Sequence, residues 1–249
     1  MRNLKLTLAY DGTDFSGWQV QPDAQTIQGT LASAIGRITK EKVLPQGSGR
    51  TDAGVHALAQ VASFWTESSI PVDNLVVALN DVLPASIRVV RAEEVPAEFH
   101  ARKSARGKTY HYRIDREAIC PPFLARYVWH YPYPLNEQAM REAAPLVEGE
   151  HDFTSFAAVD PERGREERMS NVRTIFSSQW RRDGYELIYE VRGNGFLHHM
   201  VRNLVGTFLL VGKGTLKPQD MTRIVAEKNR AAAGATVPAS GLYLISVEY

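Results

Sequence analysis

The order of strand-like and helix-like segments constrains the fold of this chain more than any other feature of its sequence. Apolar residues alternate from Leu4 to Tyr10, which is typical of a strand with one buried face. Further strands are predicted at 43–46, 56–64 and 87–90, and helices at 27–38 and 71–83, the second one opened by a proline. The predicted order in the first half is therefore β-α-β-β-α-β, which is the order of the ferredoxin-like motif.

The second half of the chain repeats this order with longer connections. Strands are predicted at 108–114, 172–180, 186–191 and 242–247, and helices at 136–147, 197–211 and 217–230. The charged stretch 160–168, which contains a proline and a glycine, is predicted to be a mobile loop. We expect an α+β fold of two ferredoxin-like βαββαβ halves, residues 1–98 and 99–249, whose mixed or antiparallel sheets form a central cleft.

Composition narrows the function classes only a little. The formal net charge is +1, so the overall charge identifies no partner. The single cysteine, Cys120, excludes an intramolecular disulfide and is compatible with a reducing compartment. The N-terminal apolar stretch contains charged residues, and no run approaches the ~20 apolar residues of a membrane helix. We therefore expect a cytoplasmic protein without a membrane partner.

Residues 47–57 read GSGRTDAGVHA and place a lone carboxylate, Asp52, two positions from Arg50 among three glycines. In an extended segment these two side chains share one face while Thr51 takes the other. A neighbouring guanidinium favours the ionised form of a carboxylate, which can then act as a nucleophile or a base. His56 is a further candidate for the same site, whereas Asp11, in an Asp-Gly turn, is interpreted as a turn residue. The alternative is a solvent-facing ion pair, which is common and weak.

Residues 100–113 read HARKSARGKTYHYR and contain five cations and no acid. The cations are Arg102, Lys103, Arg106, Lys108 and Arg113. Cations bind phosphates regardless of nucleic-acid sequence, and the interleaved Tyr110 and Tyr112 could stack on nucleobases. The alternative is an ordinary basic strand whose tyrosines pack inward. On a strand both tyrosines share a face with Lys108, which favours a role beyond dry packing.

Residues 196–203 read FLHHMVRN. On the predicted helix His198 and Arg202 share a face, as do His199 and Asn203. An arginine in so apolar a helix needs a partner, and a carboxylate such as Asp52 would serve; otherwise its head group lies in water at the rim of the core. Adjacent histidines do not face one metal ion, and no metal-ligand spacing, P-loop or dinucleotide fingerprint occurs elsewhere.

Together these segments resemble the bacterial tRNA pseudouridine synthase A family along nearly the whole chain. The segments that carry the resemblance are YDGTDFSGWQVQP (10–22), TIQGTL (26–31), GSGRTDAGVHA (47–57), FHARKSARGKTYHYRI (99–114), HDFTSFAA (151–158), GNGFLHHMVRNLVG (193–206) and PASGLYL (238–244). The string GRTDAGVHA is highly specific, and its occurrence with the others makes chance similarity an inadequate explanation.

The resemblance implies an isomerase, an intramolecular transferase, that converts uridine to pseudouridine at positions 38, 39 and 40 in the anticodon stem-loop of tRNA. It implies that Asp52 is the nucleophile, that Arg50 helps to extrude the target nucleotide, and that Tyr110 stacks on the flipped uracil. Arg202 would pair with Asp52. Arg102, Lys103, Arg106, Lys108, His56 and Leu242 are the expected substrate-binding residues. No cofactor or metal is implied, and the family is typically a homodimer.

Three other functions remain compatible with the residues. A non-catalytic RNA-binding protein would use the cations and tyrosines but not Asp52. A nucleoside glycosidase usually employs two carboxylates, whereas only Asp52 stands out in these motifs. A pseudouridine synthase with another substrate range would share the same chemistry. Attack by Asp52 on the uracil ring, attack on the sugar carbon and removal of a sugar proton all stay open.

Overall fold

The computed structural model describes residues 1–159 and 170–249, which form two compact units. The first unit comprises residues 1–106 and 243–249, and the second comprises residues 107–242. The division lies at residue 106, and the domain boundary expected at residue 98 stays a prediction. The predicted mobile loop at 160–168 lies outside the described residues.

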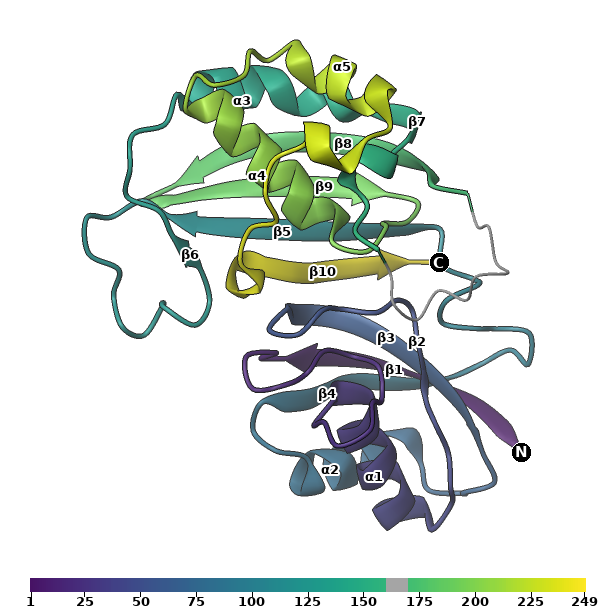
Figure 1. The fold of residues 1–249 in the computed structure, drawn as a ribbon. Helices are drawn as coiled ribbons and strands as arrows, with labels where there is room; N and C mark the ends of the chain where they lie inside the picture. The colour runs from purple at the N-terminus through teal and green to yellow at the C-terminus, as the bar shows by residue number, and fades with distance from the viewer. Residues whose placement is uncertain (160–169) are drawn as a thin grey trace. The chain divides into compact units, whose positions relative to one another are not determined.

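The first unit is a mixed sheet with two helices on one face (Figure 1). Its elements are β1 (Arg2–Tyr10), α1 (Ile27–Thr39), β2 (Gln46–Gly47), β3 (His56–Thr66), α2 (Val72–Val82), β4 (Ile87–Val95) and most of β10 (Leu242–Glu248). The strand order is β4-β1-β3-β10, with β2 paired to β3. β10 runs parallel to β3, while the other pairs are antiparallel.

Strict alternation along β1 divides the two faces of this sheet. Leu4, Leu6 and Leu8 are fully buried on one face, and Leu4 and Leu6 pair with Phe64 and Ala62 of β3. A one-residue shift would bring this apolar set to the opposite face, so the pattern specifies the register. The opposite face carries Asn3 and Lys5 of β1, which pair with Trp65 and Ser63 of β3.

The second unit also combines a mixed sheet with helices on one of its faces (Figure 1). Its elements are β5 (Gly107–Asp115), β6 (Trp129–His130), α3 (Glu137–Ala143), β7 (Gly149–Asp152), β8 (Val172–Asp183), β9 (Glu186–Gly193), α4 (Met200–Gly212) and α5 (Asp220–Glu227). The strand order is β5-β9-β8-β7, with β6 parallel to β5. Tyr189 and Phe208 lie with ring centroids 5.1 Å apart, so aromatic packing joins α4 to the sheet.

The α+β class is confirmed by these elements, and two local predictions need correction. The strand expected at 43–46 is reduced to Gln46–Gly47. The helix expected from 197 begins at Met200, because His199 has a φ of 58° and leaves the right-handed helical region. The predicted helical pairs of His198 with Arg202 and His199 with Asn203 are therefore wrong. No helix within residues 1–159 or 170–249 has the length and apolarity needed to span a bilayer.

Candidate functional site

Asp52 occupies the first position of a tight turn directly before β3. The Val55 amide donates to the Asp52 carbonyl at 3.1 Å, and Gly54 has a φ of 78°. A turn with positive φ at its third position favours glycine there, which explains Gly54. Thr51 is buried, Asp52 is partly exposed and Arg50 is exposed, as alternation predicts for an extended approach to the turn.

A buried polar network holds the backbone of this loop. The Tyr10 hydroxyl lies 2.8 Å from Thr51 Oγ1, and Gln60 Nε2 donates to the Gly49 carbonyl at 3.0 Å. The Ser48 hydroxyl donates to Gln60 Oε1 at 2.6 Å. Burial raises the pKa of Tyr10 to about 12, although its hydrogen bonds to Thr51 and Gln60 oppose the shift. Tyr10 therefore keeps its proton at neutral pH, and the network fixes the residues on both sides of Arg50.

Two glycines bring the segment that follows β1 against the same loop. A Cβ on Gly12 would lie 2.0 Å from the Val55 carbonyl oxygen, and a Cβ on Gly17 would lie 2.7 Å from that of Thr51. Gly17 also has a φ of 88°, a conformation that side-chain-bearing residues rarely adopt. The neighbouring Trp18 amide donates to the Thr51 carbonyl at 3.0 Å. The DGTDFSGW segment therefore supports the loop of Asp52.

His56 is almost fully buried beside this loop. Its Nδ1 accepts a hydrogen bond from the Gly12 amide at 3.2 Å, which leaves the ring proton on Nε2 when the ring is neutral. The Asp11 carboxylate lies 3.3 Å from the same nitrogen, and the His56 ring stacks on Tyr243 with centroids 4.8 Å apart. Asp11 also accepts from the Thr13 amide at 2.9 Å, which confirms its interpretation as a turn residue. His56 is thus a buried anchor at the start of β3.

The cations of the basic stretch differ sharply in their surroundings. Arg102, Lys103 and Arg106 have exposed side chains, and within the described part of the chain none of these side chains has a hydrogen bond or ion pair. Lys108, on β5, is partly exposed. Unpaired exposed cations can release counterions when they meet a phosphate backbone, so the first three are suited to that role.

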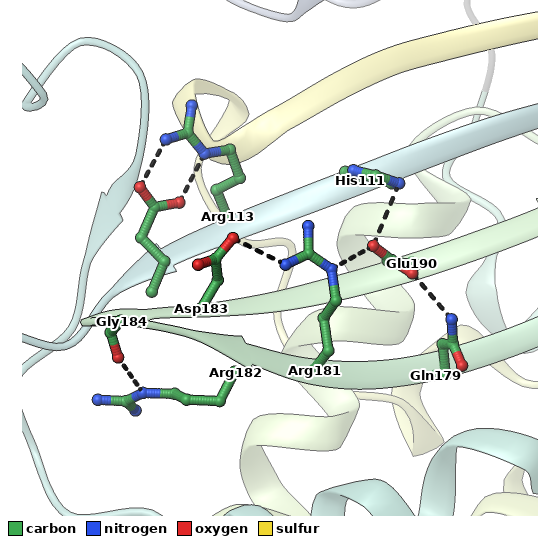
Figure 2. Close-up of polar contacts among 9 residues, drawn as sticks. His111, Arg113, Gln179, Arg181, Arg182, Asp183, Gly184 and Glu190 are labelled. Atoms are coloured by element: carbon green, nitrogen blue, oxygen red, sulfur yellow. Dashed lines mark hydrogen bonds and ion pairs between the residues drawn. The ribbon is translucent and has the colours of Figure 1, made fainter.

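Arg113, in contrast, is paired with a carboxylate on the charged face of the second unit's sheet (Figure 2). Its guanidinium makes two hydrogen bonds to Glu186, at 2.6 and 2.5 Å. Beside it, Glu190 contacts Arg181 at 2.5 Å and His111 at 3.5 Å. Burial alone would raise the pKa of Glu190, but hydrogen bonds from Arg181 and Gln179 outweigh it and the pKa is lowered. Opposite charges neutralise each other across this face, which therefore offers little attraction to a polyanion.

The two tyrosines of β5 lie on its buried side. Tyr110 is 7% exposed and meets the edge of Phe196 with ring centroids 5.0 Å apart. Tyr112 is fully buried, and its hydroxyl donates to the Pro238 carbonyl at 2.7 Å. Burial raises the pKa of Tyr112 strongly. The expectation of a role beyond dry packing is wrong for Tyr112, whereas Tyr110 keeps a small exposed fraction.

Arg202 lies in the first turn of α4 and is anchored within its own unit. Its Nε donates to the Val237 carbonyl at 2.8 Å. A Cβ on Gly206 would lie 1.9 Å from the Ala235 carbonyl oxygen, so only glycine allows α4 to approach this segment so closely. Asn203, fully buried, accepts a hydrogen bond from the Thr236 hydroxyl at 2.6 Å. These contacts fix the part of α4 from which the Arg202 side chain extends.

Leu242 is 6% exposed and follows the short 3₁₀ helix Ala239–Gly241. A Cβ on Gly241 would lie 2.7 Å from the Arg113 carbonyl oxygen and 2.8 Å from the Tyr112 ring. The segment before Leu242 is therefore packed tightly against β5. The same segment accepts the Tyr112 hydrogen bond at the Pro238 carbonyl. Its packing against β5 therefore fixes the position of Leu242.

The structure brings the predicted site residues together in two groups, one in each unit. Arg50, Asp52 and His56 belong to one loop and strand start of the first unit, and Tyr110 and Arg202 belong to the second. Sequence reasoning missed Gln60, which is fully buried and contacts the loop twice. The signal was a glutamine at the centre of the mostly apolar strand HALAQVASF.

Comparisons with known proteins identify the family of this chain. A family model described as tRNA pseudouridine synthase matches residues 7–102 and 143–249. A protein from Solibacter usitatus (strain Ellin6076) named tRNA pseudouridine synthase A is 52% identical over 249 residues, covering 100% of both chains. Proteins of the same name from Lacticaseibacillus casei (strain BL23) and Caldicellulosiruptor bescii are 47% and 45% identical, again over 100% of both chains.

Among solved structures, a chain from a crystal structure described as a Cbf5-Nop10-Gar1 complex is 13% identical, with a TM-score of 0.35. The match covers 96% of this chain and 57% of that chain, a likeness too weak to carry an argument. The family model and the full-length relatives are what identify the family. The chain belongs to the tRNA pseudouridine synthase A family and is an isomerase that acts on uridine in tRNA.

Proposed function

We propose that this enzyme isomerises uridines 38, 39 and 40 in the anticodon stem-loop of tRNA, with Asp52 as the catalytic nucleophile. The observation that carries the proposal is the loop of Asp52. Buried Tyr10, Gln60 and Ser48 hold its backbone, yet Asp52 stays partly exposed at the first position of the turn. So rigid a support for one accessible carboxylate is what a positioned reactive group requires.

The proposed reaction is an internal rearrangement of one nucleoside. The bond between the sugar C1′ and uracil N1 breaks, the base rotates, and a bond forms between C1′ and C5. The hydrogen on C5 leaves as a proton, and N1 acquires a proton, so no electrons enter or leave. Asp52 could attack C1′, add to the uracil ring or remove a sugar proton, and each route needs a carboxylate at this point.

The other residues receive roles that follow from their surroundings and from the family resemblance. A uridine within a stem must leave the base stack, at a cost of a few kcal/mol, and Arg50 would fill the space that it leaves. Tyr110 would stack on the extruded uracil, and Arg202 would pair with Asp52. The exposed Arg102, Lys103 and Arg106 would bind phosphates, and the resemblance alone gives Lys108, His56 and Leu242 a place at the substrate site.

The proposal extends to the architecture. The first unit has the order β-α-β-β-α-β and the strand order β4-β1-β3-β2, which supports a ferredoxin-like half. In the second unit β5, α3, β8, β9 and α4 follow in the order β-α-β-β-α, which supports a second one that lacks a last strand of its own. A cleft that joins both halves, a homodimer and a cytoplasmic location follow from the resemblance alone.

Tritium release from tRNA tests the proposal. A tRNA transcript labelled with tritium at C5 of its uridines should release label into water with the wild type, and Asp52→Asn should reduce the rate by at least ~10³-fold. Asp81→Asn, an exposed carboxylate on α2, is the matched control and should keep full activity.

Three results would contradict the proposal. Release by Asp52→Asn at a rate close to that of the wild type would remove Asp52 from the chemistry. Release that maps by sequencing to uridines outside positions 38–40 would keep the isomerase but refute the proposed target. Tight binding of several tRNAs without any release by the wild type would favour the RNA-binding alternative.

A further inference from the structure

The first unit contains an open cavity lined by residues of β1, β2 and β3 and of the segment that follows β4. It has a volume of about 280 Å³, and its lining includes Asn3, Leu44, Ser63, Trp65, Phe99 and His100. Ligand pockets usually span ~300–1,000 Å³, so a cavity of this size suits one planar group better than a whole cofactor. Trp65 and Leu44 are 41% and 49% exposed. These exposed fractions are large for apolar side chains in a strand or next to one.

Hydrogen bonds within the protein hold the cavity wall in place without a ligand. The Asn3 side-chain amide donates to the Pro96 and Phe99 carbonyls at 3.1 and 2.9 Å. The Ala101 amide donates to the Ser63 hydroxyl at 3.1 Å, and the Tyr249 hydroxyl donates to the Ala101 carbonyl at 2.8 Å. Residues 96–101 are therefore fastened to β1 and β3, and ligand binding would cost little ordering entropy.

His100 offers a hydrogen-bond donor at this wall. Its Nδ1 accepts from the backbone amides of Arg102 and Lys103 at 3.1 and 3.4 Å. Two donors at Nδ1 place the proton of the neutral ring on Nε2. His100, with its fixed donor, therefore lies in the same turn as Arg102 and Lys103. These two cationic side chains are exposed and have no partner among the described residues.

We propose that this cavity binds an unpaired nucleobase of the tRNA substrate, at a distance from the nucleotide that reacts. Trp65 supplies the aromatic face for stacking, His100 the donor to a base edge, and Arg102 and Lys103 bind the adjoining phosphates. Aromatic rings next to free cations form the usual single-strand binding surface. β3 separates His56, beside the Asp52 loop, from Trp65 by about 30 Å at ~3.3 Å per residue. A folded tRNA is long enough to reach both His56 and Trp65, whereas a single nucleotide is not.

The inference deepens the proposed function, since it needs tRNA as the substrate but not a particular target uridine. Trp65→Ala should raise the KM for tRNA in the tritium-release assay by about fivefold or more, with kcat within about twofold of the wild type. Trp65→Phe keeps an aromatic face and should keep most of the affinity. Leu58→Ala is the control, because Leu58 is an exposed apolar residue of the same strand outside the cavity.

Photochemical crosslinking gives a readout that does not depend on turnover. Wild-type protein irradiated with 4-thiouridine-substituted tRNA should crosslink at Trp65 or Phe99, as mapped by mass spectrometry, and Trp65→Ala should reduce that crosslink. An unchanged KM in Trp65→Ala, or crosslinks that avoid the cavity residues, would overturn the inference. Crosslinks at the cavity without tritium release by the wild type would refute the proposed function and leave the binding site standing.

Discussion

Tyr10 shows how one buried polar residue can support a reactive one. A hydroxyl removed from water costs free energy unless it is hydrogen-bonded, and a buried partner left without it costs about 1–3 kcal/mol. Tyr10 meets Thr51 at 2.8 Å and Gln60 at 3.4 Å, so each of the three buried groups has a partner. The position of Asp52, next to Thr51, therefore depends on a residue that contacts no substrate in the proposed mechanism.

The raised pKa of Tyr10 predicts a loss of stability at alkaline pH. The unfolded chain loses this proton near pH 10, whereas the folded protein keeps it to about pH 12. The stabilisation is complete below pH 10 and is lost as the pH rises toward 12, an effect of about 3 kcal/mol for a shift of this size. Tyr10→Phe should make the free energy of unfolding less dependent on pH in this range, as urea denaturation at several pH values would measure.

Tyr185→Phe is the matched control for this prediction. Tyr185 is 64% exposed in the turn between β8 and β9, so its removal should leave the pH dependence of stability as it is in the wild type. At neutral pH, Tyr10→Phe should also be less stable than the wild type by about 1 kcal/mol, because Thr51 and Gln60 lose a buried partner. Equal pH dependence in the wild type and in Tyr10→Phe would contradict the assignment.

At the scale of elements, the loop before β3 and the segment after β1 form a single support. Gly12 and Gly17 allow backbone to meet backbone where a side chain would collide with Val55 or Thr51. The Gln60 side chain secures the same loop from within β3. The loop has little regular structure, yet its backbone groups are paired on both sides, as a precise functional loop requires.

Gly17→Ala should therefore damage both stability and turnover. The added methyl group meets the Thr51 carbonyl at 2.7 Å, and a φ of 88° adds strain. Gly184→Ala is the matched control, because Gly184 also has positive φ, at 55°, but nothing lies within 4 Å of an added Cβ. We expect Gly17→Ala to cost at least ~1 kcal/mol more than Gly184→Ala in urea denaturation and to slow tritium release, which Gly184→Ala should not change. Equal costs would show that the collision is relieved elsewhere.

At the scale of the whole molecule, a net charge of +1 conceals an uneven distribution of cations. Arg113, Arg181 and Arg223 are each paired with carboxylates. Arg102, Lys103 and Arg106 lie within five consecutive residues, and no partner engages their side chains in the described part of the chain. A polyanion is therefore attracted to a local surface although the chain is nearly neutral.

This distribution predicts which cations carry the salt dependence of tRNA binding. Replacing Arg102 and Arg106 together by glutamine should reduce the slope of log K against log salt by roughly 0.7–0.9 for each phosphate that the variant no longer neutralises. Replacing Arg141 and Arg223 by glutamine is the control, because both are already paired with acids of their own helices. Filter binding at several salt concentrations measures both slopes, and an unchanged slope in the first variant would exclude these arginines from the RNA-binding surface.

Local pattern was enough to predict most of the elements, and family resemblance was enough to predict the enzyme class. Alternation and helical spacing depend on neighbours in the chain, so β1, β3, α1 and β5 could be predicted from the sequence alone. The tertiary structure decided which polar groups are paired. Arg113 and Glu186 are 73 residues apart, and no local pattern distinguishes that arginine from Arg106, whose side chain has no partner among the described residues. His198 and His199 lie outside the helix, and His198 contacts the backbone of Ala158 and Val159. The Trp65 cavity likewise forms between segments that are distant in sequence.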